Sequence, residues 1–539
     1  MSSKRTVDNH YLSLLLPAFR KHSEHIAFRS YLGDNAWSAV TYRQLESYLA
    51  VAQAHWKNTL EPLNLKPLDV VAFWLTGRKL SDLVNSIAVS SLGYTPQFFS
   101  GYFSSVSVVS GLLSKSGGKA IIIDPSFATE VSTGTAISVP HFAPLESDDL
   151  DRLVFDGTNI AVFAPVAAVG VDDLGALFHS SGTTGALPKI IPNTFKMLRA
   201  VITGKFVNAQ IPLEGGGQTV VNTLGSLAHI GSFHCFLGAV YLGQCVTQTS
   251  GMVISPEELI GLTSICKMTI LVMYAPFLST LIKAAQQDPA VKDALKSINQ
   301  VVHTGVALNK EDEEWAYANG VRIMTSYGTT ETGPMLMSRL GSDASSRLLR
   351  PLKGTTSVFI PYSDQEKGAG GLQLYELVVP SSADDSPPSE FCSDDGYYHT
   401  NDLFEKSEDG WIYRGRAGDW IKLLGGFCDT KTIEDAVRAL GAGLIHDAVV
   451  VGDGRNLAGL VVEAAEGPLD EAKRQELAQE IVKRATEFNR GLFPHERIED
   501  PERIIVVEKG SLPRTKEKGN IRRAATEAMF AETLDRVCA

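Results

Sequence analysis

Short apolar runs alternate with segments of helical spacing through the first two thirds of the chain. Apolar runs at residues 70–75 and 120–123 lie on either side of residues 81–92, whose apolar side chains recur with the spacing of a helix face. Similar runs without proline or charge return at residues 269–272 and 300–303. This alternation is typical of buried strands covered by helices. It predicts an α/β fold with layered sheets and helices.

The pattern changes from residue 432 onward to the order helix, strand, strand, helix, strand. The predicted elements are residues 433–440, 448–451, 457–464, 471–489 and 503–507. This compact order predicts a small second domain of the α+β type. Two stretches, the Ser/Asp/Pro-rich residues 381–390 and the glycine triplet 215–217, are predicted loops.

Composition limits the classes of protein to consider. The chain has 539 residues, of which 44% are hydrophobic, and its formal net charge of −12 argues against a nucleic-acid surface. The six cysteines show no C-x-x-C pair, which indicates free thiols in a reducing compartment. The longest apolar run, residues 160–171, falls short of the roughly 18 residues of a membrane span. These features predict a cytoplasmic protein without a membrane partner.

Residues 180–189, Ser-Ser-Gly-Thr-Thr-Gly-Ala-Leu-Pro-Lys, combine hydroxyls, glycines and one lysine directly after an apolar run. Glycines let the backbone approach an anion, hydroxyls and N–H groups donate to phosphate oxygens, and Lys189 adds a positive charge. The spacing does not fit a Walker loop, which has its lysine directly after the last glycine. The segment indicates a nucleotide site outside the P-loop class, although such stretches are also common surface loops.

Three further segments support a nucleotide. Residues 327–333, Tyr-Gly-Thr-Thr-Glu-Thr-Gly, follow an apolar run at 321–324 and are predicted to be a strand end that opens into a loop. They offer an aromatic face, hydroxyls and a carboxylate for adenine, phosphate and a divalent cation. Residues 398–403 and 415–425 supply Asp402 and Arg416, and residues 512–523 form a basic segment near the C-terminus. Each segment alone also fits a turn or a solvated tail.

Together these segments resemble the adenylate-forming superfamily, which comprises acyl-CoA synthetases, luciferases and the adenylation domains of nonribosomal peptide synthetases. Within it, residues 70–78, 92–100, 401–404 and 518–521 are most similar to adenylation domains of fungal synthetase-like carboxylic acid reductases. The resemblance implies a large N-terminal adenylation core, residues 1–417, and a small mobile C-terminal domain, residues 418–539. The implied cofactors are ATP and Mg²⁺, and the implied hinge is Gly418, which also fits a plain turn.

The resemblance also implies the roles of individual residues. The nucleotide would contact Ser181, Gly182, Thr183, Thr184, Gly185, Lys189, Thr304, Gly305, Val306, Ser326, Tyr327, Gly328, Thr330, Asp402 and Arg416. Glu331 is assigned to magnesium, Thr330 to the α-phosphate, and His229 to a gate beside the acyl pocket. The catalytic lysine is Lys518, with Lys516 as the alternative, because the usual Gly-Lys order is changed in this tail.

The expected substrate pocket draws on His229, Ile230, His234, Tyr274, Phe277, Gly305, Val306 and Met335. Domains that activate α-amino acids carry Asp at the position of Ile230, where it pairs with the ammonium. An unpaired buried ammonium is costly, so Ile230 favours an acid without an α-amino group, such as an aryl acid.

The leading hypothesis is activation of a carboxylic acid to acyl-AMP with release of pyrophosphate. The acyl group then passes to the phosphopantetheine thiol of a carrier domain, expected in the same parent polypeptide. The alternatives are a free-standing acid–CoA ligase and a non-catalytic nucleotide-binding relic.

Overall fold

The computed structural model describes residues 4–101, 103, 105–127, 137–155, 163–180, 188–213, 215–226, 228–305, 308–362, 373–417, 420–424, 426–514 and 521–539. The described chain divides into two compact units. The large unit holds most of the chain up to Val358 together with Val379–Tyr398, and the small unit holds Phe359–Val378 and His399–Ala539. The domain boundary between residues 417 and 418 stays a prediction.

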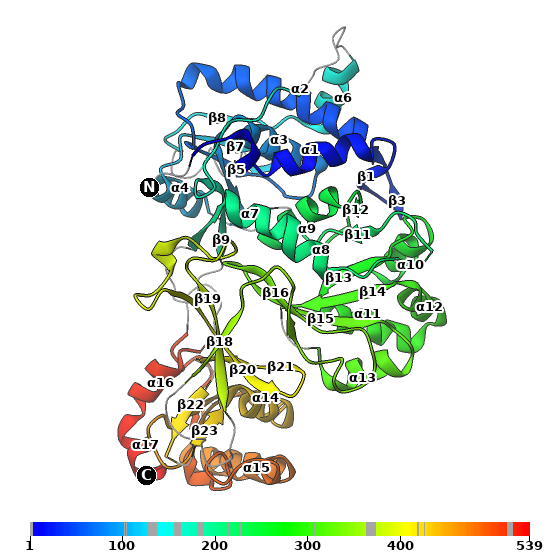
Figure 1. Ribbon diagram of the computed structural model, residues 1–539. Coiled ribbons are helices and arrows are strands. Elements are labelled where there is room, and N and C mark those ends of the chain that lie inside the picture. The colour runs from blue at the N-terminus through cyan, green and yellow to red at the C-terminus, as the bar shows by residue number, and fades with distance from the viewer. Residues whose placement is uncertain are drawn as a thin grey trace. The chain divides into compact units, whose positions relative to one another are not determined.

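The first sheet of the large unit has six strands in the order β10-β9-β6-β5-β7-β8 (Figure 1). Its strands are β5 Val70–Trp74, β6 Thr95–Phe99, β7 Ala120–Ile123, β8 His141–Phe142, β9 Leu174–Ser180 and β10 Lys189–Thr194. Only β10 runs antiparallel to its neighbour. Every residue of β5, β6 and β7 is buried, as expected for parallel strands covered on both faces.

The second sheet of the large unit has nine strands in the order β17-β16-β15-β14-β13-β11-β12-β1-β4. They are β1 Ile26–Arg29, β4 Val40–Thr41, β11 Val220–Asn222, β12 Cys245–Thr247, β13 Ile270–Tyr274, β14 Gln300–Thr304, β15 Ile323–Thr329, β16 Gly333–Met337 and β17 Arg350–Pro351. A two-stranded sheet pairs β2 Tyr31–Gly33 with β3 Ala36–Trp37. The central strands β11, β13, β14 and β15 are parallel, so their C-terminal ends meet at one edge.

Helices cover these sheets. They are α1 Leu12–Lys21, α2 Tyr42–Leu60, α3 Leu80–Ser91, α4 Val106–Ser116, α6 Ser147–Phe155, α7 Phe195–Ala200, η4 Val201–Phe206, α8 Val207–Ala209, α9 Ile230–Tyr241, α10 Pro256–Ser264, α11 Ala275–Gln287, α12 Pro289–Ser297 and α13 Lys310–Ala318. Short 3₁₀ turns are η1 Val7–Asn9, η2 Glu61–Leu63, η3 Pro125–Phe127 and η5 Ser389–Phe391. The strands and the helix predicted from the apolar pattern are confirmed, and residues 215–217 lie in a loop. The predicted loop 381–390 is confirmed up to residue 388, because residues 389 and 390 begin η5.

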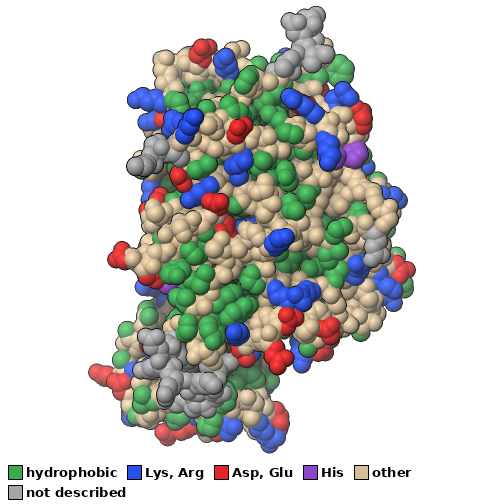
Figure 2. All heavy atoms as spheres, in the orientation of Figure 1, with side chains coloured by type: hydrophobic (Ala, Val, Ile, Leu, Met, Phe, Trp, Pro, Cys, Tyr) green, Lys and Arg blue, Asp and Glu red, His purple; other side chains and the backbone are tan. Residues whose placement is uncertain are grey.

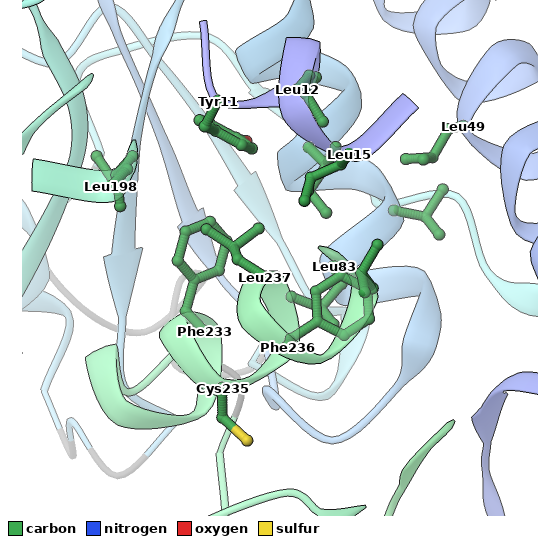
Figure 3. Packing of buried hydrophobic residues seen from close by; sticks show 14 of the residues in the cluster. Tyr11, Leu12, Leu15, Leu49, Leu83, Leu198, Phe233, Cys235, Phe236 and Leu237 are labelled. Atoms are coloured by element: carbon green, nitrogen blue, oxygen red, sulfur yellow. The ribbon is translucent and has the colours of Figure 1, made fainter. Parts of the chain in front are cut away.

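Helix α9 is central to the core of the large unit. Phe233, Phe236 and Leu237 on this helix point toward Leu12 and Leu15 of α1, whereas the sulfur of Cys235 points away from α1 (Figure 3). Because residues three and four apart share a helix face, Phe233, Phe236 and Leu237 lie on one side of α9, and this side packs into the core.

Three sheets lie wholly or mostly in the small unit. The strands are β18 Val358–Pro361, β19 Leu374–Pro380, β20 Tyr397–Ser407 and β21 Gly410–Arg416 in one sheet, β22 Trp420–Leu423 and β23 Gly426–Asp429 in the second, and β24 Ile445–Val451, β25 Gly459–Ala464 and β26 Ile504–Val507 in the third. The helices are α14 Thr430–Leu440, α15 Glu471–Arg490, α16 Arg523–Met529 and α17 Ala531–Val537, with the 3₁₀ turn η7 Pro501–Arg503. The predicted order helix, strand, strand, helix, strand is confirmed.

Charges are dispersed over the surface. Basic and acidic side chains are interspersed on the face drawn in Figure 2, in keeping with the modest excess of carboxylates. Among the described residues, no helix combines the length and the apolar character needed to cross a membrane.

Candidate active site

A cavity of about 300 Å³ lies in the large unit along the nine-stranded sheet and reaches the C-terminal ends of β13 and β14. Its walls come from the chain after η4, from β11, β13 and β14, from α9 and from the β15–β16 hairpin. The lining residues are Phe206, Ala209, Gln210, Val221, Leu224, His229, Ile230, Gly231, His234, Cys235, Ile270, Val272, Tyr274, Gln300, Val302, Thr304, Gly305, Ser326, Gly328, Thr329, Thr330, Gly333, Pro334 and Met337. Nine of these residues were predicted from the sequence.

The N-terminal turn of α9 forms one wall. His229 is the N-cap, and its Nδ1 accepts a hydrogen bond of 3.1 Å from the Gly231 N–H. Ile230 and His234 are one helical turn apart and therefore share a face of α9, and both reach the cavity. Ile230 is only 3% exposed, so a substrate group that contacts this wall meets an apolar side chain that is shielded from water.

Both histidines of this wall are neutral. His234 is 1% exposed, and its Nε2 donates to the Asn193 Oδ1 at 2.9 Å. Burial, helped by the positive charge of Lys205, lowers the pKa of His234 to about 3. His229 keeps solvent-accessible surface at the mouth of the cavity, yet the protein around its ring displaces water and lowers its pKa from 6.5. Neither ring carries a charge at neutral pH.

The ends of β13 and β14 form the second wall. Gly305 has a φ of +89°, and a Cβ at this position would lie 2.9 Å from Tyr274 Cδ1. Glycine is therefore required both by the left-handed backbone and by the close approach of the tyrosine ring. Thr304 precedes it in the lining, whereas Val306 is outside the described residues. Burial raises the pKa of Tyr274, which keeps its phenol neutral.

The segment expected to be a loop after a strand is instead a hairpin. Strand β15 continues through Thr329 and pairs with β16, with Tyr327 opposite Leu336 and Thr329 opposite Gly333. The two strands approach closely, since a Cβ on Gly328 would lie 2.4 Å from the Gly333 carbonyl oxygen. The predicted strand, which ended near Met324, was too short, because the glycine and threonine residues that follow show no apolar pattern.

This hairpin contributes Ser326, Gly328 and Thr330 to the lining. Tyr327 lies between two lining residues on the strand, and alternate residues face opposite sides, so it is not among them. Glu331 is in the turn, is partly exposed and is also outside the lining. The described residues contain no cluster of three metal-binding side chains, and magnesium at Glu331 stays a prediction.

Two of the expected pocket residues lie elsewhere. Phe277 packs edge-to-face on Tyr274, with ring centroids 6.2 Å apart, and joins the core beneath the wall. Met335 is fully buried, and its Sδ accepts a hydrogen bond of 3.3 Å from the Lys205 Nζ. Both support cavity walls from behind, because the strand or helix that carries them turns their side chains away from the opening.

The hydroxyl-rich segment connects two paired strands. Ser180 at the end of β9 is opposite Lys189 at the start of β10, so this segment begins and ends at one point of the six-stranded sheet. Lys189 is exposed there. The predicted phosphate contacts Ser181, Gly182, Thr183, Thr184 and Gly185 lie outside the described residues.

The small unit brings Asp402 and Arg416 together. They are directly opposite on β20 and β21, with Arg416 Nε 3.3 Å from Asp402 Oδ1. Asp402 is 2% exposed and also accepts a hydrogen bond of 3.1 Å from the Tyr413 hydroxyl. A carboxylate held by two donors in this way is oriented to accept from further hydroxyl groups.

Lys516, Lys518 and Gly418 lie outside the described residues. The residues that flank the lysines are well held, because Arg514 forms a bridge with Ile521 and pairs with Asp447 at 2.9 Å. The chain therefore returns to the same place after the segment that carries both lysines.

The described lining contains no formally charged side chain. Its polar groups are hydroxyls, the two neutral histidines and the amides of Gln210 and Gln300, which sequence reasoning missed. Gln300 donates to the Ala209 carbonyl at 3.0 Å and Gln210 to Gln244 at 3.1 Å. Only the folded chain brings these glutamines to the cavity, since nothing in their local sequence distinguishes them from surface residues. The arrangement suits an uncharged, largely apolar group with threonine hydroxyls at one end.

Comparison with known proteins agrees with this geometry. A family model described as "AMP-binding enzyme" matches residues 17–360, and one described as "AMP-binding enzyme C-terminal domain" matches residues 423–539. The chain is 30% identical over 489 residues to the AMP-binding domain-containing enzyme IboA of Amanita muscaria, covering 89% of this chain and 92% of that protein. It is 26% identical over 477 residues to the adenylate-forming reductase StbB of Stachybotrys bisbyi, covering 84% of this chain but only 41% of that protein.

Among solved structures, ATP-bound MatB from Rhodopseudomonas palustris matches with a TM-score of 0.69 at 18% identity. The match covers 97% of this chain and 99% of MatB. At that identity the likeness concerns the fold, and it confirms the expected large N-terminal domain followed by a C-terminal domain.

Proposed function

The chain belongs to the AMP-binding enzyme family and is an adenylate-forming ligase, and we propose that its substrate is a carboxylic acid whose acyl group is aryl or similarly apolar and carries no charge. A carboxylate is a poor acyl donor because its leaving group would be oxide. Attack of a carboxylate oxygen on the α-phosphorus of ATP forms a new P–O bond, breaks the bond to the β-phosphate and releases pyrophosphate. The product is a mixed anhydride whose AMP is a good leaving group.

The observation that carries the substrate proposal is the charge-free cavity wall. An ammonium or second carboxylate on the acyl group would lose its water without meeting an opposite charge among the described lining residues. The apolar side chains of Ile230, Val272 and Val302 favour a flat hydrocarbon group instead. His234 and Gln210 offer neutral hydrogen bonds to a substituent on that group.

In this proposal the hairpin residue Thr330 donates to the α-phosphate, and Thr183, Thr184 and Lys189 contact the triphosphate. Asp402 accepts hydrogen bonds from the ribose hydroxyls. The Tyr413 hydroxyl and Arg416, which already contact this carboxylate, hold it in the orientation that this requires. Lys518 places its ammonium between the carboxylate and the α-phosphate, where it offsets the repulsion of two anions.

A carboxylate in a turn beside a phosphate site fits magnesium, which uses one or two carboxylates together with substrate phosphates. Glu331 is the residue that would hold it, and the ion would supply neutralisation of the triphosphate charge.

The second half-reaction is proposed to load a carrier. The phosphopantetheine thiolate attacks the carbonyl carbon, the bond to AMP breaks, and a thioester forms. The similarity to StbB, an adenylate-forming reductase, supports a carrier domain as partner. The alternative acceptor is coenzyme A, whose thiol arm has the same chemistry.

The test is an acid-dependent pyrophosphate-exchange screen over benzoic, arylalkanoic, aliphatic and α-amino acids, followed by thioester formation with coenzyme A or a phosphopantetheinylated carrier. We expect exchange only with acids whose acyl group carries no charge, and we expect the thioester to form on the carrier. Preference for an α-amino acid contradicts the substrate proposal, thioester on coenzyme A alone favours the ligase alternative, and absence of exchange with every acid contradicts both.

A further inference from the structure

Lys205 is a charged residue inside the large unit that the proposed chemistry does not use. It lies in η4, a π-helical turn between α7 and α8, and its side chain is fully buried. Its Nζ is 3.2 Å from Oδ2 of Asp385, which is itself 3% exposed and accepts a hydrogen bond of 3.1 Å from the Thr356 N–H. The result is a buried ion pair between a helix and the loop after β19.

The ammonium has a further partner in the β15–β16 hairpin. Nζ donates to the Thr332 carbonyl at 2.6 Å. The Thr332 N–H in turn donates to the Thr329 Oγ1 at 3.2 Å, and the two threonine hydroxyls are 3.0 Å apart. The ammonium therefore fixes the peptide around which the hairpin turns, directly next to Thr329, Thr330 and Gly333 of the cavity lining.

Stability alone is a poor explanation for this pair. Two buried charges are expensive to desolvate, and replacing such a pair by apolar residues of similar volume is often neutral or stabilising. Burial lowers the pKa of Lys205, and the charge of the Asp385 carboxylate and its hydrogen bond oppose that shift. What the pair does supply is one defined orientation for the groups bonded to it.

The π-helical turn that carries Lys205 directs its side chain to the β15–β16 hairpin. A π turn contains one more residue than an α turn and is frequent at functional sites. Gly204 lets this turn approach the loop after β17, since a Cβ there would lie 3.2 Å from the Gly354 carbonyl oxygen. The turn directs Lys205 to the hairpin, while the following residue, Phe206, lines the cavity.

We propose that Lys205 is a positioning residue for adenylation: its ammonium holds the Thr332 carbonyl and thereby sets the Thr329–Gly333 turn against the cavity. The inference rests on the proposed function, in which Thr330 of this turn donates to the α-phosphate. Asp385 keeps the ammonium in place.

The test variant is Lys205→Met/Asp385→Asn. It removes both charges together, and the asparagine oxygen still accepts from Thr356, so neither charge is left buried alone. The control is Lys79→Met/Asp124→Asn, which removes another ion pair of the large unit, 3.0 Å apart, in which Asp124 is buried and Lys79, which also pairs with Glu146, is partly exposed. Both proteins are compared with the wild type in unfolding midpoint, in kcat and KM for pyrophosphate exchange, and in hydrogen exchange of peptides spanning residues 329–333.

The double variant is expected to unfold near the wild-type midpoint but to lose about 100-fold in kcat, the effect of a misplacement of about 1 Å in an active site. KM for the acid should change little, because α9, β13 and β14 are untouched. Amides at 329–333 should exchange about tenfold faster, an opening shift of about 1.4 kcal/mol, while those of β14 keep their protection. The control should keep its kcat and its protection at 329–333.

Wild-type kcat in the double variant, or a kcat loss matched by the control, would overturn the proposal. Should the double variant fail to fold, Asp385→Asn decides: without the carboxylate that keeps the ammonium in place, kcat and the protection at 329–333 should fall together by about tenfold, and an unchanged kcat contradicts the proposal. If the wild-type protein supports no exchange with any acid, the proposed function fails, and the hydrogen-exchange comparison still tests whether Lys205 holds the turn.

Discussion

Replacing Ile230 by aspartate should reverse the class of acid that the enzyme activates. Ile230 is the first residue of α9, is 3% exposed and lines a cavity whose described wall carries no formal charge. L-Phenylalanine and 3-phenylpropanoic acid have nearly the same shape and differ by the α-ammonium. Their comparison therefore isolates the cost of bringing one positive charge to this wall.

The magnitude follows from the surroundings. Leaving a buried charge without a partner costs about 3 to 5 kcal/mol, and His229 at the mouth remains exposed, which favours the lower value. A cost of about 3 kcal/mol corresponds to about 150-fold in kcat/KM in favour of phenylpropanoate for the wild type. In Ile230→Asp the new carboxylate pairs with the ammonium, and the N-terminus of α9 stabilises it by a further 0.3 to roughly 1 kcal/mol.

The assay is kcat/KM for pyrophosphate exchange with both acids, in the wild type, in Ile230→Asp and in Ile230→Asn. The asparagine variant has the shape of aspartate without its charge and should not gain activity with phenylalanine. A wild-type enzyme that prefers phenylalanine would refute the reasoning, because the ammonium would then have a partner that the charge-free wall does not supply.

Three further predictions concern other parts of the chain. Lys518→Ala should lose adenylate formation by a few hundredfold, about 3 to 4 kcal/mol, while transfer from a preformed adenylate to thiol continues; an active Lys518→Ala beside an inactive Lys516→Ala would instead assign the role to Lys516. Gly418→Pro fixes φ near −65° and should block one domain orientation, so that thiol transfer falls sharply while ATP binding, followed by calorimetry, survives; equal loss of both half-reactions with weaker ATP binding would make Gly418 a structural turn. His10 donates from Nε2 to the Ser90 carbonyl at 3.0 Å, and burial lowers its pKa from 6.5 to about 4, so the unfolded chain binds the proton more readily and stability is lost as the pH falls through this window. Within it the unfolding free energy of the wild type should fall by about 1.4 kcal/mol per pH unit more than that of His10→Gln, and equal slopes in urea titrations would show that His10 is not the titrating group.

The sequence was most informative where burial on both faces leaves a continuous apolar run. Residues 70–75 and 300–303 were predicted as strands and are β5 and β14 within one residue. The topology then explains why Tyr274 and Thr304, distant in the chain, meet at one cavity, since they end neighbouring parallel strands. Ile230 and His234 were expected in the pocket from the family resemblance, and their spacing of one turn on α9 explains why both reach the cavity.

Other parts were not predictable from local pattern. The turn of the β15–β16 hairpin is rich in glycine and threonine, and the pairing of β15 depends on a strand that begins after this turn. Lys205 reads as an exposed lysine on a helix, because the π turn shifts the periodicity and its partner Thr332 is 127 residues away. Asp385 stands in a stretch whose composition indicates a solvated loop, yet its side chain is buried.

The central claim, attack of the substrate carboxylate on the α-phosphorus of ATP, is tested most directly by oxygen-18. The best acid of the exchange screen, labelled in both carboxylate oxygens, is converted with ATP and the thiol acceptor, and the products are analysed by mass spectrometry. One labelled oxygen should appear in AMP and the other in the thioester carbonyl, with unlabelled pyrophosphate. Unlabelled AMP, or label in inorganic phosphate beside ADP, would contradict the account.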